Sequence, residues 1–150
     1  MAIHVGDNAP DFTLKTQDDK EWKLSGFRGQ NVVLLWDPLD WSPTCEKENC
    51  SISKEGTLQH PNTVVVGISR DSTWSHKAWK KERGIKHELL ADPMLEVTKK
   101  YDLLHPAGFI SHRATVIVDK QGKVAFVDVQ EKTPEARDMG AVKQALDKLR

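Results

Sequence analysis

Both cysteines of this 150-residue chain lie close together, at Cys45 and Cys50. Cys45 ends the segment 38–45 (PLDWSPTC), which follows the apolar run 32–36 (VVLLW). This order predicts a thiol at the corner between a strand and a helix. Backbone N–H groups converge at such a corner, where they lower the pKa of a thiol and make it a nucleophile. Cys50 is close enough to capture whatever Cys45 becomes, so the spacing indicates redox chemistry.

Other interpretations of the two cysteines fit the sequence less well. A cysteine is most often a small buried hydrophobe, but the residues around Cys45 are polar or turn-forming. A zinc site usually has two close pairs of ligands, whereas His60 and His76 lie far along the chain. A thioredoxin-type dithiol has the spacing C-x-x-C. We therefore expect a reactive thiol that works without a metal or an organic cofactor.

Length and charge narrow the class of protein. A chain of this size is one domain that buries roughly two-thirds of its surface on folding. Lys+Arg and Asp+Glu number 22 each, which gives no electrostatic reason to expect nucleic acid or an anionic membrane. We find no apolar run of about 18 residues and no signal-peptide pattern. The sequence predicts one cytoplasmic domain over residues 1–150.

The apolar pattern predicts an α/β domain, in which a central mixed sheet is flanked by helices. Alternation around residues 17–20 predicts an N-terminal β-hairpin. Largely apolar runs predict strands at 31–36, 63–68, 114–118 and 124–129. Caps and helical spacing predict helices from 44 to about 56, from 71 to about 84, from 92 onward and over 142–149. The expected order is β-β-β-α-β-α-α-β-β-α.

The cysteine segment closely resembles the peroxiredoxin signature P-x-x-x-[T/S]-x-x-C, with a glutamate three residues after the cysteine. Pro38, Ser42, Cys45 and Glu48 stand at those places. Four further stretches resemble the same family, in order: 9–14 (APDFTL), 65–71 (VVGISRD) followed by His76, 89–93 (LLADP), and 113–119 (RATVIVD) with Gly122. The resemblance covers about residues 5–130 and implies a thioredoxin-like fold and the reduction of hydroperoxides.

The position of Cys50 resembles the atypical two-cysteine, bacterioferritin-comigratory-protein-like branch of that family, in which the second thiol resolves the first within the same chain. The resemblance implies hydrogen peroxide and organic hydroperoxides as substrates, a thioredoxin- or glutaredoxin-like reductant, and a homodimer. Two alternatives stay open. Cys50 is a bystander in a one-cysteine peroxidase, or oxidation of Cys45 serves a peroxide-sensing or holdase protein.

The chemistry of O–O cleavage fits this resemblance. It needs a thiolate, a peroxide held in line, and donors for the charge that develops on the oxygens. We expect Cys45 to be the nucleophile, with Ser42 donating and accepting at the peroxide. Arg113 would supply the cation, Glu48 would orient it as a bidentate partner, and Pro38 would shield the sulfur from water.

Each of these residues also has a simpler interpretation. Ser42 caps a helix, Glu48 is a solvated helix residue, and Pro38 ends a strand. In the same way, Arg113 is a surface charge and Cys50 a buried helix residue. His76 shows no spacing of a catalytic triad, so we expect it at the surface or at a cap.

Two further expectations concern the site. Asp37 stands where the family usually has an aromatic or apolar residue. A carboxylate close to Cys45 would disfavour the thiolate; alternatively, it points away or pairs with a lysine. In an ideal helix the Cα atoms of Cys45 and Cys50 are roughly 8.7 Å apart, whereas a disulfide needs roughly 4.4–6.8 Å. Residues 44–51 must therefore unwind to form a disulfide, and the polar run 46–49 is expected to tolerate water.

Overall fold

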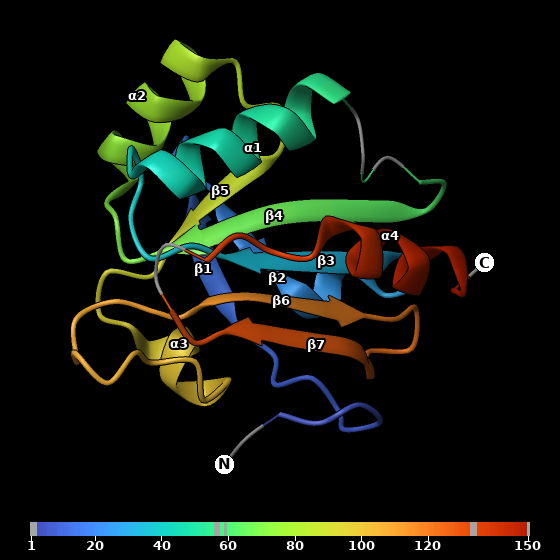
Figure 1. The fold of residues 1–150 in the computed structure, drawn as a ribbon. Helices are drawn as coiled ribbons and strands as arrows, with labels where there is room; N and C mark the ends of the chain where they lie inside the picture. The colour runs from blue at the N-terminus through green and yellow to red at the C-terminus, as the bar shows by residue number, and fades with distance from the viewer. Residues whose placement is uncertain (1–2, 56–57, 59, 133–134, 150) are drawn as a thin grey trace.

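A mixed β-sheet forms the centre of the molecule (Figure 1). The computed structural model describes residues 3–55, 58, 60–132 and 135–149. Within them, the strands are ordered β2-β1-β5-β4-β3-β6-β7 across the sheet. The strands are β1 (Thr13–Thr16), β2 (Glu21–Lys23), β3 (Asn31–Trp36), β4 (Thr63–Ser69), β5 (Glu88–Ala91), β6 (Arg113–Val118) and β7 (Val124–Gln130). The helices are η1 (Leu24–Phe27), α1 (Pro43–Glu55), α2 (Thr73–Arg83), α3 (Glu96–Lys100) and α4 (Met139–Asp147).

Strand β3 lies at the centre of the core because both of its faces are apolar. Successive side chains of a strand point to opposite faces, so Val33 and Leu35 pack with residues of α1 and α4. Val32, Leu34 and Trp36 pack on the opposite face, with residues of α3 and the N-terminal segment. Figure 1 shows α1 and α3 on opposite sides of the sheet. A strand buried on both faces explains the uninterrupted apolar run in the sequence.

The neighbours of β3 bring distant segments to one edge of the sheet. Strands β3, β4 and β5 run parallel to one another, whereas β6 pairs antiparallel with β3. Trp36 at the end of β3 pairs with Ala114 near the start of β6. Arg113 therefore begins its strand beside the point where the chain leaves β3 for α1. This pairing places a cation next to the cysteine segment.

Most of the expected elements are confirmed. The hairpin, the four apolar strands and the helices near residues 44, 72 and 142 are all present, with ends shifted by a few residues. Ser72 caps α2, and Gly84 ends it in the left-handed conformation (φ 66°), which costs glycine little. The expected order was incomplete, because residues 88–91 form strand β5, which pairs with β1 and β4. The third helix, expected from residue 92, begins at Glu96, and the Asp92 carboxylate accepts hydrogen bonds from its backbone at Val97 and Thr98.

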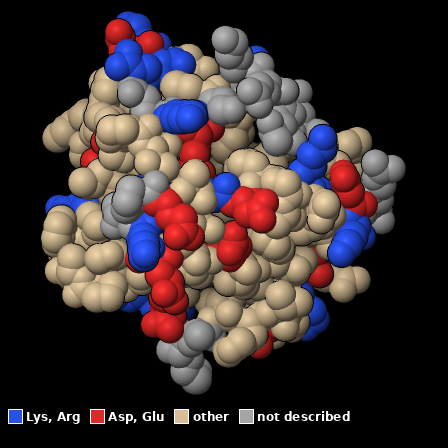
Figure 2. All heavy atoms as spheres, in the orientation of Figure 1, with Lys and Arg blue, Asp and Glu red and all other residues tan. Residues whose placement is uncertain are grey.

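The surface charge is mixed in sign. Figure 2 shows basic and acidic side chains intermingled on one face, with several acidic ones gathered near its centre. This distribution agrees with the equal numbers of basic and acidic residues in the sequence. In the described part of the chain, no helix is long and apolar enough to cross a membrane.

Candidate active site

Cys45 lies in the first turn of α1, with its side chain fully buried (0% exposed). The sulfur accepts a hydrogen bond from Arg113 Nη1 at 3.0 Å. On the other side, Cys45 packs in a small apolar cluster with Trp79, Ile85 and Leu89. The expected pairing of this cysteine with the arginine at the start of β6 is present in the structure. The thiol therefore lies between a charged side chain, that of Arg113, and a cluster of apolar side chains.

Two buried carboxylates also contact Arg113. Arg113 Nη1 lies 3.0 Å from Glu48 Oε1 and 3.2 Å from Asp37 Oδ1. Glu48 follows Cys45 by three residues, so both side chains lie on the same face of α1. Asp37 follows the last residue of β3, and its carboxylate points toward the site. The alternative that Asp37 points away or pairs with a lysine is wrong, because its carboxylate pairs with arginine and is only 2% exposed.

A second arginine, Arg137, completes this charged cluster. Its Nη2 lies 2.5 Å from Asp37 Oδ1, and its backbone N–H donates to Glu48 Oε2 at 2.8 Å. The same guanidinium donates to the backbone carbonyls of Trp36 and Ala114. Arg137 thus links the end of β3 to the start of β6 next to the site. Two guanidiniums and two carboxylates balance in charge, so ionisation of Cys45 would add one net negative charge to the cluster.

Little in the sequence points to Arg137 as a residue of the site. The residue lies in an irregular stretch before α4, outside every recognised motif. The available signal was indirect: Asp37 and Glu48 flank the cysteine, and two buried carboxylates need more than one cation.

Opposing effects act on the ionisation of Cys45. Burial and the charge of Asp37 raise the pKa of this thiol to about 11, while hydrogen bonds from Ser42 and Arg113 and the charge of Arg113 act in the opposite direction. Burial also disfavours the charge on Arg113, but its negative neighbours hold the pKa of Arg113 above its usual value. The expectation that the strand–helix corner lowers the pKa of this thiol is therefore wrong, because burial outweighs the groups that favour the thiolate. The expected sign of the effect of Asp37 on the thiol agrees with its place in the cluster.

The loop between β3 and α1 carries the remaining expected residues. Pro38 is buried directly after Asp37. Ser42, which precedes α1, donates to the carbonyl of Leu39 at 3.0 Å. Trp41 is 41% exposed, adopts a left-handed backbone conformation (φ 69°), and lies under the guanidinium of Arg83. Of these loop residues, Ser42 acts on the thiol directly, whereas the shielding expected of Pro38 stays a prediction.

A buried pair anchors this loop to the rest of the molecule. His76 Nδ1 lies 2.7 Å from Asp40 Oδ2, and His76 Nε2 lies 3.0 Å from the carbonyl of Leu90. Ser75 also donates to the Asp40 carboxylate. Burial raises the pKa of Asp40, while His76 acts in the opposite direction. The expectation that His76 is a surface or capping residue is wrong, because its polar ring has partners inside the core.

Cys50 lies one and a half turns further along α1 and is partly buried. Both cysteines are reduced, and the Cys50 sulfur lies 3.9 Å from the carbonyl of Arg83 at the end of α2. Residues 43–55 form one continuous helix, so the two thiols are held apart as the helix geometry predicts. That residues 46–49 tolerate water while the helix is open stays a prediction; in the closed helix, Glu48 and Asn49 are both buried.

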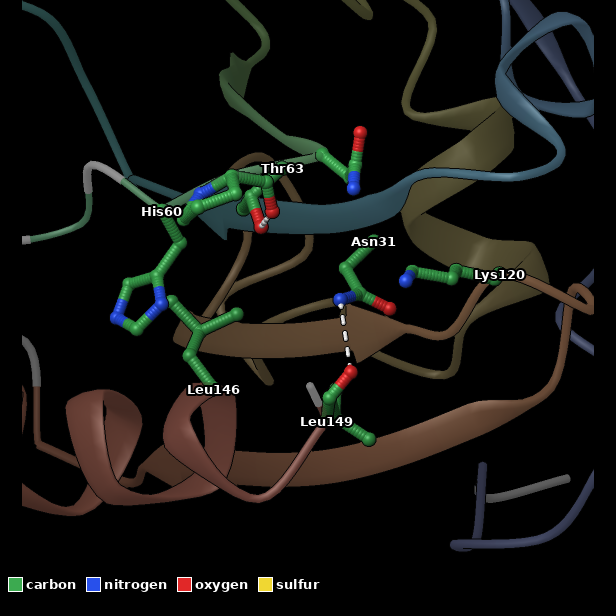
Figure 3. A pocket seen from close by; sticks show the side chains of 8 residues that line it. Asn31, His60, Thr63, Lys120, Leu146 and Leu149 are labelled. Carbon is green, nitrogen blue, oxygen red and sulfur yellow. Dashed lines mark hydrogen bonds between the residues drawn. The ribbon is translucent and has the colours of Figure 1, made fainter.

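A separate pocket of about 500 Å³ lies at the other end of β3. Figure 3 shows Asn31, His60, Thr63, Lys120, Leu146 and Leu149 around it, with the Asn31 amide donating to the Leu149 carbonyl. Asn31 begins β3, whereas the cysteine site follows its last residue. The pocket therefore contributes nothing to the environment of Cys45.

The sheet order and the buried cysteine at the start of α1 define a thioredoxin-like protein whose thiol is held by an arginine. A family model described as AhpC/TSA family matches residues 5–127. The chain belongs to this family, the peroxiredoxins, as its motifs predicted.

Relatives from plants point to one branch of the family. The chain is 35% identical over 135 residues to peroxiredoxin Q from Triticum aestivum, and covers 62% of that protein with 89% of its own length. Identity to peroxiredoxin Q from Sedum lineare is also 35%, with 89% of this chain and 73% of the relative covered. These similarities fit the bacterioferritin-comigratory-protein-like branch. The chain thus spans about three-fifths of the length of several curated relatives. Both plant relatives are named chloroplastic, so the cytoplasmic location stays a prediction.

Solved structures agree with this assignment. A reduced 2-Cys peroxiredoxin from Plasmodium vivax superposes with a TM-score of 0.85 at 31% identity, covering 95% of this chain and 80% of its own. A peroxiredoxin-like protein from Aquifex aeolicus reaches a TM-score of 0.92 at 25% identity, covering 100% of this chain and 90% of its own. The expected thioredoxin-like fold is therefore confirmed.

Proposed function

We propose that this protein is a thiol-dependent peroxidase in which Cys45 attacks hydrogen peroxide and organic hydroperoxides. The observation that carries the proposal is the 3.0 Å hydrogen bond from a buried arginine, Arg113, to the Cys45 sulfur. The position of this pair in a member of the AhpC/TSA family supports it. The thiolate attacks one peroxide oxygen, the O–O bond breaks, and the other oxygen leaves as water or alcohol after taking up a proton. Cys45 is left as a sulfenic acid.

The neighbouring residues have distinct roles in this proposal. Arg113 stabilises the thiolate and the negative charge that develops on the oxygens. Glu48 and Arg137 hold Arg113 in place through the charged cluster. Ser42 borders the thiol at the loop, where its hydroxyl can accept from the peroxide and, after turning away from the Leu39 carbonyl, donate to it. Pro38 limits the access of water.

Resolution of the sulfenic acid is the second half of the proposal. Cys50 condenses with it to give an intramolecular disulfide and water, and a thioredoxin- or glutaredoxin-like dithiol then reduces that disulfide by exchange. The presence of Cys50 on the same helix supports this route. Because α1 is continuous, the helix must open between the two cysteines before the bond can form.

Peroxide consumption over many turnovers tests the function. The purified protein is supplied with hydrogen peroxide or cumene hydroperoxide, and with dithiothreitol or a thioredoxin system as reductant. We expect wild-type protein to consume many equivalents of peroxide and Cys45→Ser to consume none. Stoichiometric oxidation without turnover under every reductant would contradict the enzyme and favour a sensor.

Cys50→Ser separates the two-cysteine mechanism from the one-cysteine mechanism. We expect this variant to undergo the first oxidation and to lose turnover with thioredoxin, while small thiols sustain some activity. Normal turnover of Cys50→Ser with every protein reductant would show that Cys50 is a bystander. The peroxidase proposal would survive that result, but its resolving step would not.

A further inference from the structure

Asn49 is a buried polar residue of α1 for which the proposed chemistry has no role. It lies between Glu48 and Cys50, and its side chain is only 1% exposed. Its amide nitrogen donates to Asp37 Oδ2 at 2.9 Å and to the carbonyl of Cys45 at 2.8 Å. Its amide oxygen lies 2.7 Å from His87 Nε2. The carboxylate of Asp37 fixes this orientation, because only the NH2 end of the amide can face it.

His87 reaches Asn49 from the segment just before β5. Burial lowers the pKa of His87 to about 4, so the ring is neutral at neutral pH and carries one N–H. Because Nε2 faces an amide oxygen, that N–H is on Nε2 and donates to Asn49. Asn49 therefore joins α1 to the end of β3 through Asp37 and to the entrance of β5 through His87.

These hydrogen bonds lie within the part of the helix that must open. Unwinding residues 44–51 moves Asn49 away from both partners, and leaves a buried acceptor on Asp37 and a partly buried donor on His87 without their partner. Buried polar groups without partners are costly. The helix therefore opens less readily than its polar sequence suggests.

We propose that Asn49 is a positioning residue that fastens α1 to Asp37 and His87. This inference rests on the proposed function. The fastening slows the opening of the helix, and so delays closure of the disulfide between the two cysteines. In the interval, Cys45 stays a sulfenic acid inside the closed helix.

Asn49→Ala tests this role of Asn49, because a local effect and the loss of its hydrogen bonds change the rate of helix opening in opposite directions. Alanine is a better helix former than asparagine, so a purely local role would make the variant open more slowly. Loss of the fastening predicts the opposite, with disulfide closure about tenfold faster or more. Lys47→Ala, at an exposed position of the same helix, is the matched control and should close at the wild-type rate.

Time-resolved intact mass separates the two chemical steps. Reduced protein receives one equivalent of hydrogen peroxide, and samples are quenched with acid over time. Gain of one oxygen reports sulfenic acid, and its loss as water reports the disulfide. We expect Asn49→Ala to speed the second step. His87→Phe should also speed the second step. The double variant should form the disulfide no faster than the faster single variant, because both changes break the same Asn49–His87 hydrogen bond.

Amide hydrogen exchange of the reduced protein tests the same inference without peroxide. Exchange at residues 46–50 should be about tenfold faster in Asn49→Ala than in Lys47→Ala, since exchange follows local opening. If wild-type Cys45 gains no oxygen, the proposed function fails while this arm still tests the fastening. Unchanged or slower exchange and disulfide closure in both Asn49→Ala and His87→Phe would overturn the role of Asn49.

Discussion

Replacing Asp37 with asparagine should lower the pKa of Cys45. The two side chains share one guanidinium nitrogen, which lies 3.0 Å from the sulfur and 3.2 Å from Asp37 Oδ1. The sulfur and this oxygen are therefore no more than about 6.2 Å apart, a range over which unit charges interact strongly in a buried site. A negative charge at that distance disfavours the thiolate, and asparagine removes the charge while keeping an acceptor for the two arginines.

The size of this effect follows from Coulomb's law. At an effective dielectric constant of about 20, two unit charges about 6 Å apart repel by about 3 kcal/mol. That energy corresponds to about two pKa units. Burial is the larger cause of the raised pKa and stays in the variant, so we expect a decrease of about one to two units from the charge alone. The new NH2 group faces that of Asn49, so the fold should lose about 1–3 kcal/mol of stability.

The assay is the pH dependence of alkylation by iodoacetamide, followed by intact mass. Working in a Cys50→Ser background assigns the signal to Cys45. Asp19→Asn is the matched control, because Asp19 is exposed in a turn and has a left-handed backbone conformation (φ 61°) that asparagine tolerates. An unchanged midpoint in Asp37→Asn, or a midpoint that rises, would refute the assigned repulsion.

Three further predictions follow from the same geometry. Arg113→Ala should slow peroxide attack by on the order of 10²-fold or more in stopped-flow measurements, and a loss within about threefold would remove Arg113 from the reaction. Oxidation to the disulfide should speed hydrogen exchange over residues 44–51, and an oxidised form with unchanged protection there would contradict helix opening. Stability should fall as the pH decreases from 6.5 toward 4, because the unfolded chain protonates His87 before the folded one does. Urea titrations should show a smaller decrease in the free energy of unfolding over this pH range for His87→Gln than for the wild type.

The local parts of the site could be predicted from the sequence. Cys45 and Glu48 are three residues apart on one helix, so their shared face follows from helix geometry. The placement of Arg113 came from the family resemblance, and the antiparallel pairing of β3 with β6 explains it physically. These contacts depend on short spacings or on regular strand register, which a sequence expresses directly.

The long-range polar contacts could not be predicted in the same way. Arg137 reaches Asp37 from an irregular segment 100 residues further along the chain, and periodicity says nothing about such a segment. Asn49 belongs to a polar run that has the composition of a solvated helix face, yet Asp37 and His87 make its burial favourable. Strand β5 was missed because its short apolar run, followed by an aspartate and a proline, also fits the entry of a helix.

Intact mass after one equivalent of hydrogen peroxide tests the central claim most directly. We expect the wild-type protein to lose the mass of two hydrogen atoms as the disulfide between Cys45 and Cys50 forms. Cys50→Ser should instead gain one oxygen, and Cys45→Ser should keep its mass. A Cys45→Ser variant that is oxidised as fast as the wild type, or a wild-type mass that stays unchanged, would contradict Cys45 as the thiol that reduces peroxide.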